Sequence, residues 1–398
     1  MSDKYSGLRK ASLLVGSTLT VMAGAIVAPA LPLISREFAD VAGIELLSRL
    51  VLTLPALFMG ILAPIAGYFT DRVGRRKVLL FSLILYAVAG TTGLYLHNLY
   101  WILAGRALLG IAVGGLITAV ITLIGDYFEG EERSRFMGLQ AAFAGLGGLI
   151  FISLGGVLAD INWRMPFVLY IVSLVLWVMS YVSVSEPQKK IESTPKSGAG
   201  SSVNNGTKIP GIIIFVYIIT FFSAIVFYMI PVQMPFMLSD IEGVTNARIG
   251  FAIAFMNVAS VTTSVNYGRV RRKFSFPAIL FMVYMLVFVG YMVISQSANY
   301  YVMILGIIFC GLGFGLMLPN LNLWLISLAP PDMRGRLVGY LNMFLFLGMF
   351  ASPIALQPLV KASNIHQTFF IIGLVIFFTG IFFLFYELRN RKLSTVKE

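Results

Sequence analysis

Long apolar runs recur from one end of the chain to the other, separated by short polar segments. Many of these runs reach the length of about 20 residues that a helix needs to cross the hydrocarbon core of a bilayer. The predicted spans are residues 11–34, 47–69, 77–96, 99–125, 135–158, 164–185, 210–238, 247–267, 275–295, 299–328, 335–359 and 367–387. Runs such as 369–385 do not alternate between polar and apolar residues, as the strands of a membrane barrel do. The pattern therefore predicts an all-α membrane protein with twelve transmembrane helices.

Composition agrees with this prediction. Hydrophobic residues make up 58% of the 398 residues and charged residues only 12%, whereas a soluble domain is about 45–50% apolar and about a quarter charged. The basic start and the small residues at 23–25 have some features of a signal peptide. The apolar run is too long for one and leads directly into further spans, so we expect an uncleaved first helix.

The net charge of +12 could indicate a nucleic-acid partner, but the basic residues have a one-sided distribution. Of the 29 lysines and arginines, 23 fall in the segments on the same side as both predicted termini, 5 fall on the other side, and only Arg106 lies well inside a span. Cytoplasmic segments of membrane proteins are enriched in Lys and Arg. The distribution predicts that both termini are cytoplasmic, in a plasma membrane (the inner membrane of a bacterium), and it accounts for the basic excess without nucleic acid.

The chain divides into two halves of six spans. Residues 186–209 form the one long polar, Ser/Gly/Asn-rich stretch, which predicts a cytoplasmic linker between bundles at 1–185 and 210–398, the second with a short cytoplasmic tail. Glycines and arginines of the two halves also match at a fixed offset of 201 residues: Gly110 with Gly311, Gly114 with Gly315, Arg133 with Arg334, Arg135 with Arg336, Gly138 with Gly339 and Gly147 with Gly348. We therefore expect two pseudo-symmetric six-helix bundles with a substrate site between them near the membrane midplane.

The loop between the second and third spans carries a specific motif. It contains Gly67, Asp71, Arg72, Gly74, Arg75 and Arg76 in the order Gly-x-x-x-Asp-Arg-x-Gly-Arg-Arg. Glycine permits a tight turn, and a carboxylate is favoured beside a helix N-terminus. The motif resembles the signature of the major facilitator superfamily, and this resemblance implies the major facilitator fold, a gate at this loop and an ion pair between Arg75 and Asp126. The alternative is that the basic run only anchors the loop on the cytoplasmic side.

A second motif surrounds the charge inside the fourth span. Arg106 is followed by Gly110 and Gly114 at intervals of one helical turn, which resembles another motif of the same superfamily. A charge inside a membrane is costly and marks a candidate functional site. We expect Arg106 to contact substrate or to couple transport to protons; the alternative is that it bonds to backbone carbonyls and stiffens the bundle.

Two further features concern the branch of the superfamily. Trp163, Arg164 and Phe167 resemble a motif of the twelve-helix drug:proton antiporter branch. Antiporters of the superfamily usually carry Gly-Pro-x-x-Gly-Gly in the fifth span, but here Phe151 and Ile152 precede Gly155 and Gly156. The missing Gly-Pro weakens the assignment to export.

Polar side chains within the spans are candidates for lining the cavity. The set is Tyr228, Gln233, Asn257, Asn320, Asn322, Asn342 and Gln140. Pro231 and Pro235 are expected to break the seventh span beside Tyr228 and Gln233. Amides can orient a substrate, but they also hold membrane helices together. Every acidic residue falls at a span end or in a loop, so we expect no carboxylate in the cavity.

These features predict a secondary active transporter that works by alternating access. The leading interpretation is a proton-coupled exporter of amphipathic small molecules, of the drug-efflux type. The alternative is a proton-coupled transporter of a specific metabolite, sugar or siderophore. An enzyme is remote, because no catalytic cluster occurs in the spans, and the lone Cys310 predicts neither disulfide nor metal site. We expect no cofactor, and partners limited to substrate, protons and lipid, with the protein functioning as a monomer.

Overall fold

The computed structural model describes residues 6–186, 211–330 and 333–395, and their secondary structure is entirely helical. The helices of the first half are α1 (Ser6–Ala25), η2 (Ala28–Ala30), α2 (Leu31–Glu37), α3 (Ile44–Val73), α4 (Arg75–Gly90), α5 (Thr92–Tyr95), α6 (Leu99–Tyr127), α7 (Gly130–Ile161), η3 (Met165–Ile171) and α8 (Val172–Ser183). Those of the second half are α9 (Gly211–Ser239), α10 (Asn246–Arg271), α11 (Phe276–Ser295), α12 (Tyr300–Leu328), α13 (Arg334–Ala362) and α14 (Ile365–Thr395).

Twelve helical segments within the described residues are long and apolar enough to cross a membrane, which confirms the predicted number of spans. Two spans are not regular α-helices throughout. The first comprises α1, η2 and α2, with Pro29 and Pro32 at the starts of its last two pieces. The sixth begins as the 3₁₀ segment η3 with Pro166 in its first turn. In each case, proline starts a helical segment where its missing N–H costs least.

The prediction that two prolines break the seventh span is wrong. Helix α9 runs without interruption through Pro231 and Pro235. Proline is tolerated inside membrane helices because neighbouring helices and local adjustments satisfy the backbone groups that it leaves unpaired.

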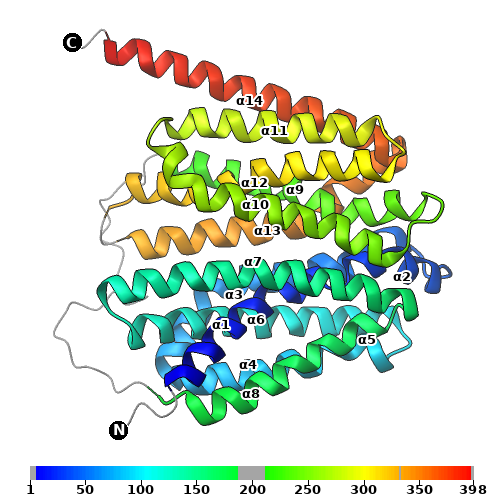
Figure 1. Ribbon diagram of the computed structural model, residues 1–398, viewed down its shortest axis with the longest axis vertical. Helices are drawn as coiled ribbons and strands as arrows, with labels where there is room; N and C mark the ends of the chain where they lie inside the picture. The colour runs from blue at the N-terminus through cyan, green and yellow to red at the C-terminus, as the bar shows by residue number, and fades with distance from the viewer. Residues whose placement is uncertain (1–5, 187–210, 331–332, 396–398) are drawn as a thin grey trace.

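The helices run back and forth between two faces of the molecule, at the left and right of Figure 1. The start of α1 and the end of α14 lie on the left-hand face, which we call the termini face; the other is the opposite face. The helices of each half pack mainly among themselves, α6 against α3 and α4 in the first half and α11 against α12 and α14 in the second. Two long contacts join the halves, α7 with α10 and α3 with α13.

The internal repeat is visible in the packing. A Cβ atom added at Gly110 would lie 2.4 Å from the carbonyl oxygen of Pro55, and one added at Gly311 would lie 2.4 Å from that of Met256. Gly110 and Gly311 are 201 residues apart in the sequence, and so are their partners Pro55 and Met256. Small residues allow helix backbones to approach this closely inside a membrane. The pseudo-symmetry of the two bundles is therefore reproduced as matching contacts.

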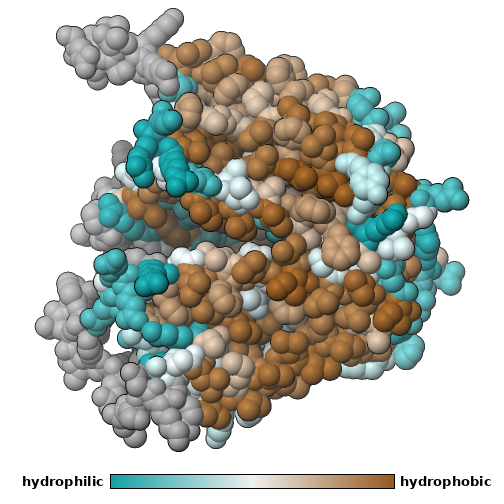
Figure 2. All heavy atoms as spheres, in the orientation of Figure 1, coloured by the Kyte–Doolittle hydropathy of each residue, from teal (hydrophilic) through white to brown (hydrophobic). Residues whose placement is uncertain are grey.

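The surface has the polarity of a membrane protein (Figure 2). Large apolar side chains such as Phe81, Val265 and Phe378 are more than half exposed, and an apolar belt separates polar residues at the two faces. A water-soluble monomer rarely exposes apolar patches of this extent. The predicted linker at 186–209 lies, except for Glu186, outside the described residues.

Candidate functional site

A pocket of about 340 Å³ lies within the second half, at the middle of its helices. Its lining comes from α9, α10, α12 and α13, the residues being Phe227, Ser260, Ser264, Phe314, Gly315, Met317, Leu318, Pro319, Asn322, Leu345 and Met349. Its size is within the range of small-molecule sites, about 300–1,000 Å³. Asn322 is the one member of the predicted cavity set that lines this pocket.

Two other candidates lie between the halves. The hydroxyl of Tyr228 is 3.0 Å from the position that a Cβ of Gly24 would occupy, and Asn257 approaches Gly148 of α7 in the same way at 3.7 Å. Gln140 on α7 and Asn342 on α13 are half-buried, and the structure defines no polar contact for either of them.

Asn320 has a different environment from Asn322, although they are two residues apart. Its side chain is fully buried, accepts a hydrogen bond from the hydroxyl of Tyr267 at 3.1 Å and donates one to the carbonyl of Phe276 at 3.1 Å. Because both ends of its side-chain amide are hydrogen-bonded within the second half, Asn320 holds helices together there and does not line the pocket.

Gln233 contacts Arg49, which the charge count placed among the five basic residues on the side opposite the termini. Arg49 of α3 donates from Nε to Oε1 of Gln233 at 3.0 Å, and its guanidinium carbon lies 4.1 Å from the ring centroid of Phe236. Arg49 is 4% exposed and Gln233 is fully buried. Arg106 was predicted to be the only charged residue well inside a span; Arg49, near the start of α3, is a second buried charge. The available signal was that Arg49 falls within the predicted span 47–69.

Two further polar contacts join the halves at the opposite face. The carboxylate of Asp160, at the end of α7, accepts hydrogen bonds from the backbone N–H groups of Asn246 (2.7 Å) and Ala247 (3.0 Å) and from the Asn246 side chain (3.0 Å). These are the first residues of α10, where the helix dipole favours a negative charge. Glu45 of α3 lies 3.1 Å from the ammonium of Lys361 on α13. The opposite face is closed by these contacts between halves.

Polar contacts at the termini face link elements of the first half to one another. The chain turns between α3 and α4 at Gly74, whose φ of 106° strongly favours glycine. Glu186 accepts hydrogen bonds from the backbone N–H groups of Arg75 at 2.7 Å and Arg76 at 2.9 Å, and so caps α4. Nε of Arg75 lies 2.8 Å from the carboxylate of Asp126 at the end of α6. The ion pair implied by the family motif is present.

The remaining motif residues lie at the end of α3. Arg72 is exposed in its last turn. Gly67 and Asp71 belong to the same helix, but their side-chain surroundings lie outside the described part of the structure.

Arg106 is fully buried within the first half. Its guanidinium donates to the hydroxyl of Tyr170 at 2.9 Å and to the carbonyl of Gly90 at 2.7 Å, and it lies 4.8 Å from the ring centroids of Phe167 and Tyr170. The hydroxyl of Tyr170 in turn donates to the carbonyl of Ala23 on α1 at 2.8 Å. Arg106 therefore connects four elements, α4, α6, η3 and, through Tyr170, α1.

The two glycines after Arg106 differ in their packing. Gly110 lies against the backbone of α3, where no side chain fits without movement. A Cβ at Gly114 would have its nearest neighbour, Leu62 Cβ, at an ordinary 3.8 Å. Only the first glycine is required for close helix approach in this conformation.

Within the described residues, no group of three or more His, Cys, Asp or Glu side chains could hold a metal ion. Cys310 is buried.

Comparisons with known proteins identify relatives over almost the whole chain. Residues 13–353 and 216–398 match the profile of the Major Facilitator Superfamily. The chain is 24% identical over 385 residues to the bacillibactin exporter of Bacillus subtilis (strain 168), covering 93% of each, and 26% identical over 348 residues to the class D tetracycline resistance protein of Salmonella ordonez, covering 86% of each. A crystal structure of a bacterial homologue of the human lysosomal transporter Spinster, inward-facing and unoccupied, superposes with a TM-score of 0.80 at 15% identity over 98% of both chains.

Proposed function

Since the chain belongs to the Major Facilitator Superfamily, we propose that it is a proton-coupled secondary active transporter that exports amphipathic small molecules by alternating access. It is an integral protein of the plasma membrane. Curated relatives along most of its length are named as exporters or resistance proteins, including the bacillibactin exporter and the tetracycline resistance protein described above. These names support export as the direction of transport.

One observation carries alternating access for this chain. The polar contacts at the opposite face, Asp160 with α10, Arg49 with Gln233 and Glu45 with Lys361, run from one half to the other. The ion pair that the structure defines for Arg75 at the termini face stays within one half. Among the contacts of the described residues, this difference between the two faces is the one expected when one half rocks against the other and one face is closed at a time.

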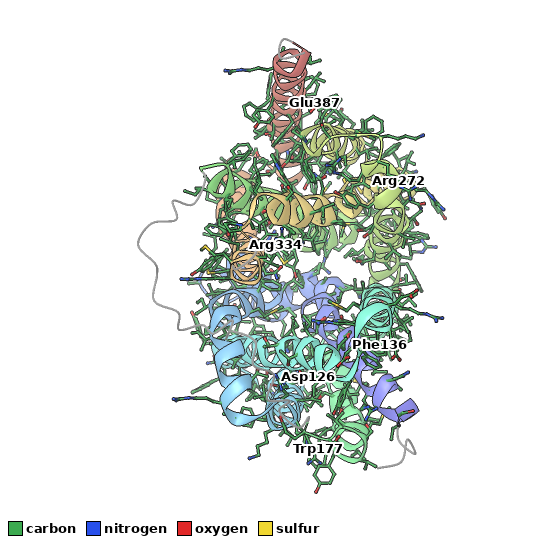
Figure 3. The ribbon with its side chains drawn as sticks, turned by 90° about the vertical axis from the view of Figure 1, so that its left-hand side faces the viewer. Asp126, Phe136, Trp177, Arg272, Arg334 and Glu387 are labelled. Carbon is green, nitrogen blue, oxygen red and sulfur yellow. The ribbon has the colours of Figure 1, made fainter. Side chains whose placement is uncertain are left out.

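The basic residues support an orientation with the termini face in the cytoplasm. Seen from this face, Arg272 and Arg334 lie in the second half, and Asp126 lies below them in the first half (Figure 3). Because cytoplasmic loops are enriched in Lys and Arg, we assign this conformation as inward-facing. In this proposal the two bundles rock against each other, and the linker at 186–209 connects them on the cytoplasmic side.

The motif residues receive roles in this cycle. Gly67, Asp71, Arg72, Gly74, Arg75, Arg76 and Asp126 form the cytoplasmic gate. Arg106 links the fourth span to the first through Tyr170, so a change in its hydrogen bonds alters the contacts of both helices. This connection makes Arg106 a candidate for coupling rather than for direct substrate contact. Gln233 joins Arg49 in closing the opposite face, and Tyr228, Asn257, Asn342 and Gln140 lie on helices that border the path between the halves.

The second candidate function is transport of one specific metabolite, sugar or siderophore. The observation in its favour is the chemistry of the pocket, which has two serines and an asparagine but no carboxylate. We propose that the chain is not an enzyme and works as a monomer.

Reconstitution in proteoliposomes tests the proposal. An imposed pH gradient, with the compartment that receives substrate acidic, should drive accumulation of at least one compound from a panel of amphipathic drugs, sugars and siderophores. Asp126→Asn protein in the same liposomes serves as a gate-impaired control. Accumulation that needs no pH gradient, or none with any compound, contradicts proton antiport. Saturable transport of one compound alone would favour the second candidate.

A further inference from the structure

The pocket in the second half has walls without charge. None of the described residues that line it is ionisable, and apart from two serines and one asparagine they are Phe, Met, Leu, Pro and Gly residues. Moving an ionised group from water into such a site without a counter-charge is strongly unfavourable. A ligand with a permanent charge would therefore lose hydration and gain no ion pair here.

The apolar walls favour a flat ring system. Phe227 and Phe314 meet edge to face, with centroids 4.8 Å apart and an interplanar angle of 84°. Such rings offer both a face and an edge to a further aromatic group. Met317 and Met349 also line the pocket, and methionine adapts to irregular apolar shapes.

Three polar side chains interrupt the apolar surface. Ser260 and Ser264 lie one turn apart on α10, and within the described residues neither hydroxyl has a hydrogen-bond partner. Hydroxyl side chains on membrane helices commonly donate to the carbonyl one turn earlier, as Thr262 does to Val258 at 2.9 Å. The amide of Asn322, which also lines the pocket, donates to the carbonyl of Leu318 at 3.0 Å, and its side-chain oxygen has no hydrogen-bond partner within the described residues.

From these observations we infer that the pocket binds an uncharged, aromatic ligand with one or two hydrogen-bonding groups, held by the hydroxyls of Ser260 and Ser264 and the carbonyl oxygen of Asn322. The inference rests on the proposed function in that it assigns the substrate class of the same transporter. It separates this chain from an exporter of organic cations, which needs a buried carboxylate to replace the hydration of its substrate.

Two probes that differ in charge and by one methyl group test the ligand class. The neutral probe is 6-propionyl-2-(dimethylamino)naphthalene, and the cation is its trimethylammonium derivative. Binding is measured by equilibrium dialysis of the full chain in lipid nanodiscs, with empty nanodiscs as background. The neutral probe should bind at least about tenfold more tightly, because the cation loses hydration and the described lining residues include no carboxylate to pair with it. Equal or tighter binding of the cation would overturn the inference.

Variants on α10 test the site. Ser260→Ala combined with Ser264→Ala should weaken binding of the neutral probe about three- to tenfold, the loss expected for one hydrogen bond. Thr262→Ala on the same helix, outside the lining, should leave binding unchanged. Ser264→Asp adds a carboxylate to the lining and should improve binding of the cation relative to the neutral probe. If the serine variants match Thr262→Ala, the assigned site is wrong.

The two proposals fail in different ways. Preferential binding of the neutral probe by a protein that moves nothing in a pH gradient would retain the ligand class and overturn proton-coupled export. Export of the cation driven by a pH gradient, with the neutral probe excluded, would retain the transporter and overturn the ligand class.

Discussion

Asp160 holds the opposite face closed, and neutralising it should shift the protein toward the state that is open on that face. The carboxylate accepts three hydrogen bonds from the start of α10 in the other half. These bonds are available only when the ends of α7 and α10 touch. Asp160→Asn keeps one acceptor oxygen and the side-chain size but removes the charge and the second acceptor.

The expected magnitude follows from these bonds. A hydrogen bond to a charged group contributes about 1.5–3 kcal/mol, and a charge at a helix N-terminus about 0.3–1 kcal/mol at an exposed position. Asp160 is exposed and part of the interaction survives in the variant, so we expect a loss of about 1–2 kcal/mol from the closed state. Each 1.4 kcal/mol is about a factor of ten in an equilibrium constant. The ratio of the two states should change by about 5- to 30-fold.

Distances between spin labels across the opposite face measure this change. Asp40→Cys in the first half and Glu242→Cys in the second place labels on exposed positions, and the native Cys310 is buried. Pulsed electron–electron double resonance on the doubly labelled Asp160→Asn protein in nanodiscs should show a larger population at long label-to-label distances. Asp240→Asn, an exposed acid on the same face, is the matched control. Identical distance distributions in the two variants would refute the role of Asp160 in holding the opposite face closed.

Four further variants probe the first half. Gly110→Ala should destabilise the fold by about 1–3 kcal/mol through overpacking, seen as a lower melting temperature, whereas Gly114→Ala should leave it within experimental error; equal effects would contradict the packing. Asp126→Asn should slow substrate exchange several-fold in proteoliposomes at unchanged thermal stability. Unaltered exchange rates would contradict a gating role for its ion pair with Arg75. Arg106→Ala should abolish substrate movement while equilibrium binding to the second-half pocket persists, and loss of binding would instead indicate substrate contact.

The number of membrane spans was predictable because it depends on a local property. An apolar run of sufficient length forms a helix in lipid wherever it occurs, since the backbone has no other partners there. The ion pair of Arg75 with Asp126 was predictable for a different reason, the family motif. Gly74, whose positive φ follows from the turn between α3 and α4, is a further local feature of that motif.

The candidate cavity was less predictable because the helices are apolar on every side. Asn320 and Asn322 are two residues apart, or about 200° around a helix. One is bonded to Tyr267 inside the scaffold, and the other lines the pocket. A soluble helix would have revealed its inner side by a polar outer side, but a membrane helix exposes apolar residues to lipid as well.

The sequence alone determined the twelve spans, the two related halves and the gate motif, because each depends on residues that are close in the chain or repeated at a fixed offset. Only the tertiary structure decided which face is closed and where the pocket lies. Arg49 and Gln233 are separated by 184 positions, and Asp160 and Asn246 by 86. Such pairs depend on how two separately packed bundles meet, and no local pattern of polarity encodes that geometry.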